Sequence, residues 1–130
     1  MAHTDTNQTP RGDSAEEFKT LEKLTDMIAY AYPILAQYPK SEKFTLVADI
    51  KRSMYDALRL CVKVGKRKSK KTALADLDVE IATLKRFVRI SFTLKFLNMQ
   101  HYKTWSGLLA EIGRMIGGMI KADNQTPPAS

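Results

Sequence analysis

Apolar side chains recur at steps of three and four residues along most of the chain, the spacing that places them on one face of an α-helix. The pattern divides into four segments, and none of them shows the alternation of apolar and polar residues typical of a β-strand. We therefore predict an all-α fold of four amphipathic helices. Helices with short connections bury their apolar faces most simply in an up-down four-helix bundle.

Capping and helix-breaking residues bound the first two predicted helices. Ser14 and Glu17 match a capping box at the start of the first helix, and Pro39 closes that segment. The second helix is expected over residues 41–64, with Gly65 as its stop signal. The predicted core positions of the two helices are Phe18, Leu21, Leu24, Ile28, Ala31 and Leu35, followed by Phe44, Val47, Ile50, Met54, Leu58 and Cys61.

The third helix is expected over residues 72–97 and the fourth over residues 99–121, with Asn98 and Thr104 as alternative caps for the fourth. The flanks, residues 1–13 and 122–130, are polar and contain few side chains that could join a core, so we expect a disordered arm and a disordered tail. Residues 14–121 then form one domain. The predicted core positions of the later helices are Leu74, Leu77, Ile81, Leu84, Val88 and Ser91, followed by Trp105, Leu108, Ile112, Met115, Ile116 and Met119.

Charge is unevenly distributed in this chain of 130 residues, whose formal net charge is +7. Residues 40–103 hold sixteen basic and six acidic side chains, whereas residues 1–39 hold three basic and six acidic ones. This asymmetry indicates an anionic partner, nucleic acid rather than a membrane. The chain start has no signal-peptide pattern and no segment is apolar enough to span a bilayer, so we expect a cytoplasmic protein.

The basic residues of the second and third helices cluster on the faces opposite their apolar positions. At 100° per residue, those of the second helix fall within about 60° of one another. If these helices are antiparallel neighbours, the two clusters and the connection between them form one positive surface able to contact several phosphates. The alternative is a solvated surface without a partner. The candidate nucleic-acid-binding residues are Arg52, Arg59, Lys63, Lys66, Arg67, Lys68, Lys70, Lys71, Lys85, Arg86 and Arg89.

Small residues form a second pattern in the fourth helix, on the side roughly opposite Trp105. A glycine inside a helix costs about 1 kcal/mol relative to alanine, so the cluster needs a compensating reason. One reason is close approach of another subunit, and the other is a helix packed on both sides within its own bundle. We expect an oligomer contact through Gly107, Ala110, Gly113 and Gly117.

Catalytic and metal-binding patterns are absent from the sequence. His3 and His101 lie outside the expected helical cores, and Cys61, the only cysteine, is expected to be a core residue. We therefore predict a protein that is not an enzyme, with no catalytic residue, metal or cofactor. Five tyrosines could stack on nucleic-acid bases, although packing at the bundle edge is the commoner role: Tyr30, Tyr32, Tyr38, Tyr55 and Tyr102.

Three stretches resemble the accessory variability determinant (Avd) proteins of diversity-generating retroelements, and the wider four-helix-bundle family that includes 23S rRNA intervening-sequence proteins. They are residues 31–34 (AYPI), residues 84–89 (LKRFVR) and, most specifically, residues 109–118 (LAEIGRMIGG). The resemblance implies a ring-like homo-oligomer, a pentamer, that binds template RNA and possibly DNA. It also implies partnership with the retroelement's reverse transcriptase in mutagenic cDNA synthesis. The basic positions that match the family helices are Arg52, Arg59, Lys63, Lys85, Arg86 and Arg89.

Two alternatives to this function stay open at the level of sequence. One is a bundle protein of the 23S rRNA intervening-sequence type, which shares the fold and much of the final motif. The other is a protein-protein interaction module without nucleic-acid binding. The strong basicity of the chain and the length of its second helix favour the Avd type.

Overall fold

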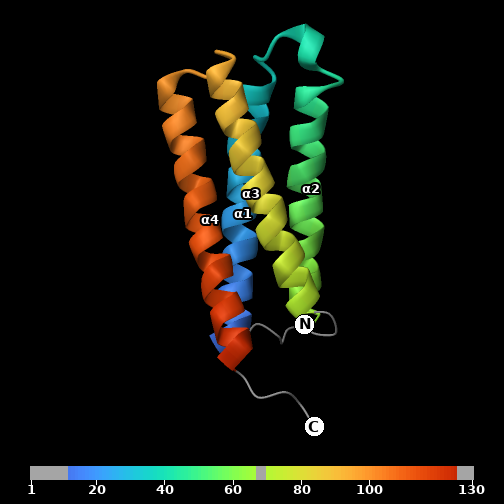
Figure 1. Cartoon of the computed structure of the whole chain (residues 1–130), viewed down its shortest axis with the longest axis vertical. Helices are drawn as coiled ribbons and strands as arrows, with labels where there is room; N and C mark the ends of the chain where they lie inside the picture. Colours follow the sequence, from blue (N-terminus) through green and yellow to red (C-terminus); the bar gives the residue numbers. More distant parts are fainter. Residues whose placement is uncertain (1–11, 67–69, 126–130) are drawn as a thin grey trace, which may run out of the picture.

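The computed structural model describes residues 12–66 and 70–125, and every regular element in them is helical. The prediction of an all-α fold is confirmed. The described residues form four long helices, labelled in Figure 1, and a short 3₁₀ segment, η2 (Lys40–Glu42), precedes the second of them. The long helices are α1 (Gly12–Leu35), α2 (Leu46–Val64), α3 (Lys70–Thr93) and α4 (Met99–Gln125).

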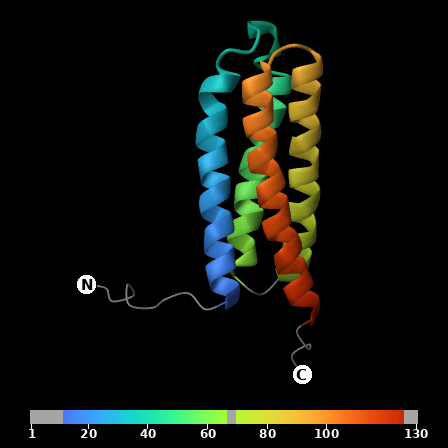
Figure 2. The same cartoon turned by 90° about the vertical axis from the view of Figure 1, so that its left-hand side faces the viewer.

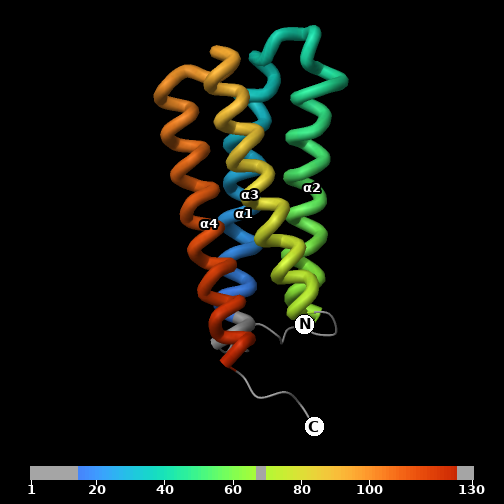
Figure 3. Tube along the Cα trace, viewed as in Figure 1, coloured from blue at the N-terminus to red at the C-terminus, as the bar shows by residue number. Residues whose placement is uncertain are grey.

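The four long helices form an up-down bundle in which consecutive helices run in opposite directions (Figures 1 and 3). Each helix contacts two neighbours: α2 packs against α1 and α3, and α4 packs against α3 and α1. Helices α1 and α4 therefore lie side by side although they are the first and last of the chain (Figure 2). Every helix is left with one outward face.

The core is centred on the apolar faces of all four helices and includes Trp105, which is fully buried. Its indole Nε1 donates a hydrogen bond to Sδ of Met27 at 3.2 Å, which gives the buried N–H a partner. The buried hydroxyls of Thr20 and Ser91 donate to backbone carbonyls one turn earlier in their own helices. The buried hydroxyl of Ser53 donates to the carboxylate of Glu80 across the α2/α3 contact.

Two aromatic residues that we expected in the core are exposed. Phe44 is 83% exposed because α2 begins at Leu46, so Phe44 precedes the helix instead of lying in its first turns. Phe18 is 56% exposed because the buried face of α1 is shifted toward Thr20, whose satisfied hydroxyl lets it occupy a core position. The predictions for Phe18 and Phe44 were therefore wrong.

The helix boundaries confirm two of the expected signals and shift others. Asn98 caps α4, because its Oδ1 accepts a hydrogen bond from the N–H of His101 at 2.7 Å, and α2 ends at Val64, directly before Gly65. Helix α1 begins at Gly12, two residues before the expected capping box. Helix α4 continues to Gln125, so residues 122–125, which we expected in the tail, are helical.

Helix α3 ends at Thr93, four residues earlier than expected, because the chain adopts a left-handed conformation at Lys95. The N–H of Phe96 donates to the carbonyl of Ser91 at 2.8 Å, and the N–H of Lys95 donates to that of Phe92 at 2.9 Å. These two bonds define a Schellman motif, in which Lys95 occupies the position that glycine usually takes. Its φ of 67° is the only positive φ of a non-glycine residue in the described chain.

We predict that Lys95→Gly stabilises the protein, because glycine adopts a positive φ without the steric cost that a Cβ imposes. The free energy of unfolding, measured by urea denaturation, is expected to rise by roughly 0.5–1 kcal/mol. Lys95→Ala is the matched control, since it removes the charged side chain and retains the Cβ. Equal stability of the glycine and alanine variants would show that this turn stores no strain.

Candidate nucleic-acid interface

The outward face of α2 carries a row of basic side chains that are all exposed: Arg52, Arg59, Lys63 and Lys66. The side chains of Arg52 and Arg59 are 66% and 69% exposed. The row points outward because Ile50, Met54, Ala57 and Cys61 occupy the opposite side of the helix and are buried. A surface of this kind can contact phosphates without rearrangement of the bundle.

Two of the arginines in this row have acidic neighbours on the same helix. Arg52 pairs with Asp49 at 2.7 Å, and Arg59 lies 3.9 Å from Asp56. These two carboxylates therefore reduce the net positive charge of this face. Exposed ion pairs contribute only about 0–1 kcal/mol, so both guanidinium groups can exchange their carboxylate for a phosphate at small cost.

Two basic residues of α3, Lys85 and Arg89, do not join the row on α2. Nζ of Lys85 lies 3.1 Å from the position that a Cβ on Gly113 of α4 would occupy. Arg89 donates a hydrogen bond to Oη of Tyr102 of α4 at 3.2 Å, so both side chains lie on the α4 side of α3. Arg86 is exposed. The structure therefore presents two basic areas instead of the single surface that we expected.

A groove of mixed charge lies between the two basic areas, where α2 and α3 meet. It is a hollow of about 680 Å³ with Leu60 and Val79 among its lining residues. Arg59 and Lys63 line it from α2, but Asp56 of α2 and two carboxylates of α3 line it as well. The α3 carboxylates are those of Asp76 and Glu80. This groove is unfavourable for a polyanion, which explains why the helix pair does not form one positive surface.

The predicted basic connection is only partly on the surface. Arg67 and Lys68 lie outside the described residues. Lys70 is largely buried, with 18% of its side chain exposed, and Nζ contacts the carboxylate of Glu17 at 3.1 Å. Lys71 is 74% exposed and contacts Asn124 of α4 at 3.0 Å and Asp123 at 3.9 Å. Lys70 therefore tethers α1 to α3, a structural role rather than the predicted binding role.

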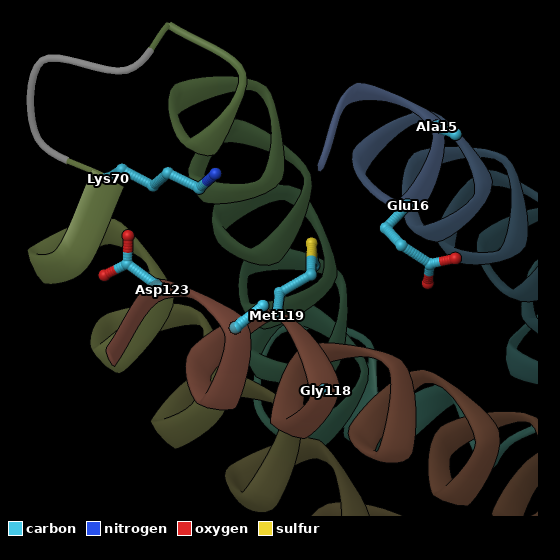
Figure 4. Close-up of a pocket in the computed structure, with 7 residues that line it drawn as sticks. Ala15, Glu16, Lys70, Gly118, Met119 and Asp123 are labelled. Carbon is cyan, nitrogen blue, oxygen red and sulfur yellow. The ribbon is translucent and has the colours of Figure 1, made fainter. Parts of the chain in front are cut away.

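Figure 4 shows this end of the bundle, where α1, α3 and α4 surround a hollow of about 390 Å³. Lys70 and Asp123 extend from facing helices, and Gly118 contributes backbone to the wall. Glu16 lines the hollow from α1. The opposite charges on its walls mark this hollow as a junction between helices, not as a phosphate site.

Two of the four predicted contact residues of α4, Gly107 and Gly117, face away from the bundle. A Cβ added to Gly107 or Gly117 would meet open space, and both residues are exposed. Gly113 differs, because the side chain of Lys85 lies over it, and Ala110 is half-buried. Packing within this bundle therefore accounts for Gly113 but not for Gly107 or Gly117, and the alternative of a helix packed on both sides is excluded.

Three basic residues that we did not predict lie on the same outward face of α4: Lys103, Arg114 and Lys121, all exposed. They alternate with the small residues at steps of three and four, the period of one helical face. The spacing in the sequence could have revealed them. Lys103 lies four residues before Gly107, and Arg114 lies three residues before Gly117, so each basic residue shares a helical face with a glycine. The outward face of α4 therefore combines glycines with cationic side chains.

The potentially reactive side chains are held in the core. Burial raises the pKa of the Cys61 thiol to about 11, with a smaller contribution from Glu17, so it remains a protonated thiol at neutral pH. Burial also raises the pKa of Tyr38 to about 12, against a smaller opposing effect of Ser91. Among the described residues, no group of three His, Cys, Asp or Glu side chains could hold a metal ion. None of the described helices is long and apolar enough to cross a membrane.

Comparison with known proteins places this bundle in a family. None of the curated proteins compared with the chain matches it. A family model described as bAvd-like matches residues 19–122, which span all four helices and include the outward faces of α2 and α4. The chain thus belongs to the bAvd-like family and is a protein of the Avd type.

Proposed function

We propose that this protein is a non-enzymatic accessory protein of a diversity-generating retroelement, which binds nucleic acid and partners the reverse transcriptase during mutagenic cDNA synthesis from template RNA. Membership of the bAvd-like family supports the biological setting. The exposed basic row on α2 is the observation that carries the binding function. Held on a rigid helix above a buried core, it fits recognition of the phosphate backbone better than recognition of base sequence.

The energetic argument rests on counterion release. Arg52, Arg59, Lys63 and Lys66 are exposed, and each phosphate that they neutralise releases condensed counterions from the nucleic acid. The ion pairs with Asp49 and Asp56 are exposed and weak, so they oppose binding only slightly. We include Lys85, Arg86 and Arg89 in a second contact area on the α3/α4 side, which a long RNA could reach around the bundle.

We predict that the triple variant Arg52→Glu, Arg59→Glu, Lys63→Glu folds and loses nucleic-acid affinity, because all three side chains are exposed and none supports the core. Affinity for a structured RNA, measured by fluorescence anisotropy, is expected to fall by at least about tenfold. The slope of log affinity against log salt should fall in magnitude by about two to three.

The matched control is Lys19→Glu, Lys40→Glu, Lys43→Glu, which changes the net charge equally at exposed positions outside α2. It should weaken binding far less, since charges beyond about 10 Å are screened. The neutral variant Arg52→Gln, Arg59→Gln, Lys63→Gln removes the positive charges without placing new glutamates beside Asp49 and Asp56. It therefore separates the loss of basic side chains from repulsion between carboxylates. Unchanged RNA affinity in both α2 variants, with circular dichroism showing folded protein, would refute the proposed interface.

We also propose that the outward face of α4 is a contact between copies of the chain in a ring-like oligomer, a pentamer by analogy with the family. Gly107 and Gly117 leave open space that nothing in the described bundle fills, and glycine there lowers helix stability without an internal benefit. Because Lys103, Arg114 and Lys121 make this face cationic, its complement on the next copy should be acidic. The exposed carboxylates of Glu22 and Asp26 on α1 offer such a complement.

We predict that Gly107→Leu with Gly117→Leu dissociates the oligomer and leaves the protomer folded. Leucine favours the helix more than glycine does, but its side chain blocks close approach. Light scattering at micromolar concentration should give an oligomeric mass for the unaltered chain and a smaller one for the variant. Ala75→Leu with Ala82→Leu, at exposed positions on α3, is the control that should retain the oligomer. A monomeric unaltered chain would eliminate this contact.

A further inference from the structure

The exposed tyrosines lie beside the basic row of α2, on the side that faces α1. We propose that this α1/α2 face binds an unpaired stretch of nucleic acid, with bases stacked on Tyr32 and Tyr55 and phosphates held by Lys51, Arg52 and Arg59. The inference rests on the proposed nucleic-acid-binding function and specifies its ligand as single-stranded.

The structure separates the five tyrosines into packed and available ones. Tyr38 is buried and tilts against Phe96, with ring centroids 5.5 Å apart. Tyr102 stacks on Phe92 at 4.2 Å, so the facing sides of both rings are already covered. Tyr30 is half-buried and lies edge-on to His101. These three tyrosines have packing roles.

Tyr32 and Tyr55 are the two tyrosines exposed in the described chain, at 37% and 38%. Tyr32 lies on α1 and Tyr55 on α2. Nζ of Lys51 lies 4.6 Å from the centre of the Tyr32 ring, a cation–π contact that joins the two helices. Lys51 precedes Tyr55 by four residues and therefore lies on the same side of α2. The two rings consequently flank one lysine.

The charged side chains nearest to Tyr55 around α2 are basic, although Arg52 and Arg59 form exposed ion pairs with Asp49 and Asp56. At 100° per residue, Arg59 and Arg52 follow Tyr55 within about 60° around α2, and Asp56 and Asp49 lie beyond them, on the side toward α3. Asp56 indeed lines the α2/α3 groove.

The matching side of α1 adds little charge. Thr25 and Ala29, which share the side of Tyr32 along α1, are uncharged, whereas Glu22 follows Phe18 by four residues and adds one exposed carboxylate. The α1/α2 face therefore combines aromatic rings with an excess of cations.

The face continues toward the start of α1. Phe18 and Val62 are 56% and 45% exposed there, and they line a hollow of about 250 Å³ together with Lys66 and Glu17. The carboxylate of Glu17 is paired with Nζ of Lys70 at 3.1 Å. From Phe18 to Tyr32 the helical rise is about 20 Å. That length suits the smallest single-strand sites, of about four nucleotides. The exposure of Phe18, which contradicted our expectation of a core residue, thus adds a third aromatic ring to this face.

The composition of the α1/α2 face favours unpaired nucleic acid over duplex nucleic acid or a protein as its ligand. A base can stack on an exposed ring only if its own face is uncovered, which excludes the interior bases of a duplex. Protein-binding surfaces are depleted in lysine, whereas here Lys51 and Lys66 accompany the rings. Interleaved cations and aromatic rings are the combination found in single-strand binding grooves.

The test compares the double variant Tyr32→Leu, Tyr55→Leu with the unaltered chain and with Tyr32→Phe, Tyr55→Phe, which keeps both rings. Fluorescence anisotropy with a twelve-nucleotide unpaired RNA should show an affinity loss of at least about tenfold for the leucine variant, since stacking contributes about 1–3 kcal/mol per base. The phenylalanine variant should bind as the unaltered chain does. Affinity for a blunt duplex DNA should change less than twofold in either variant.

The outcomes separate this inference from the proposed function. If the unaltered chain binds neither RNA nor duplex, the proposed function fails and this inference falls with it. If the unaltered chain binds RNA and the leucine variant binds the unpaired RNA equally well, this inference alone is overturned. That result would favour a protein as the ligand of the α1/α2 face. An equal loss of duplex binding would also overturn it, because stacking cannot explain that loss.

A second readout locates the contact directly. An oligonucleotide that contains 5-iodouracil should crosslink on irradiation to Tyr32 or Tyr55, as identified by mass spectrometry of the peptides. Crosslinks confined to other residues would contradict the proposed stacking.

Discussion

Each helix of this bundle has one apolar face, and burying the four faces together around Trp105 determines the rest of the molecule. Each helix packs against two neighbours, so its rotation about its own axis is fixed by which side chains the core accepts. Every charged residue must then lie on an outward face or at a helix contact. The chemistry of the surface is thus a consequence of core packing.

The outward faces that result differ in chemistry. The face of α2 is basic, the α2/α3 groove carries both signs of charge, and the face of α4 combines glycines with cationic side chains. The α1/α2 face adds exposed rings to the cations of α2. We propose that nucleic acid binds along α2 and the adjoining side of α1, and that a neighbouring copy contacts α4.

The sequence predicted the number, order and type of helices, because a period of 3.6 residues and caps such as Asn98 are local signals. It did not predict details that depend on contacts between helices. Phe18 is exposed because Thr20 takes its place in the core, and α3 ends early because Lys95 adopts a positive φ. Lys70 pairs with Glu17, and Lys85 and Arg89 face α4. Only the packed bundle shows that the predicted basic surface is divided in two.

The most direct test of the central claim is the affinity of the intact chain for a structured RNA with unpaired ends, measured across a salt series with the solution mass recorded on the same sample. The account predicts binding by an oligomer, with log affinity falling linearly against log salt at a slope of about −3 or steeper, as expected when several exposed cations contact phosphates. Absence of binding at low salt, or binding that is insensitive to salt, would contradict it and leave the bundle as a protein-interaction module.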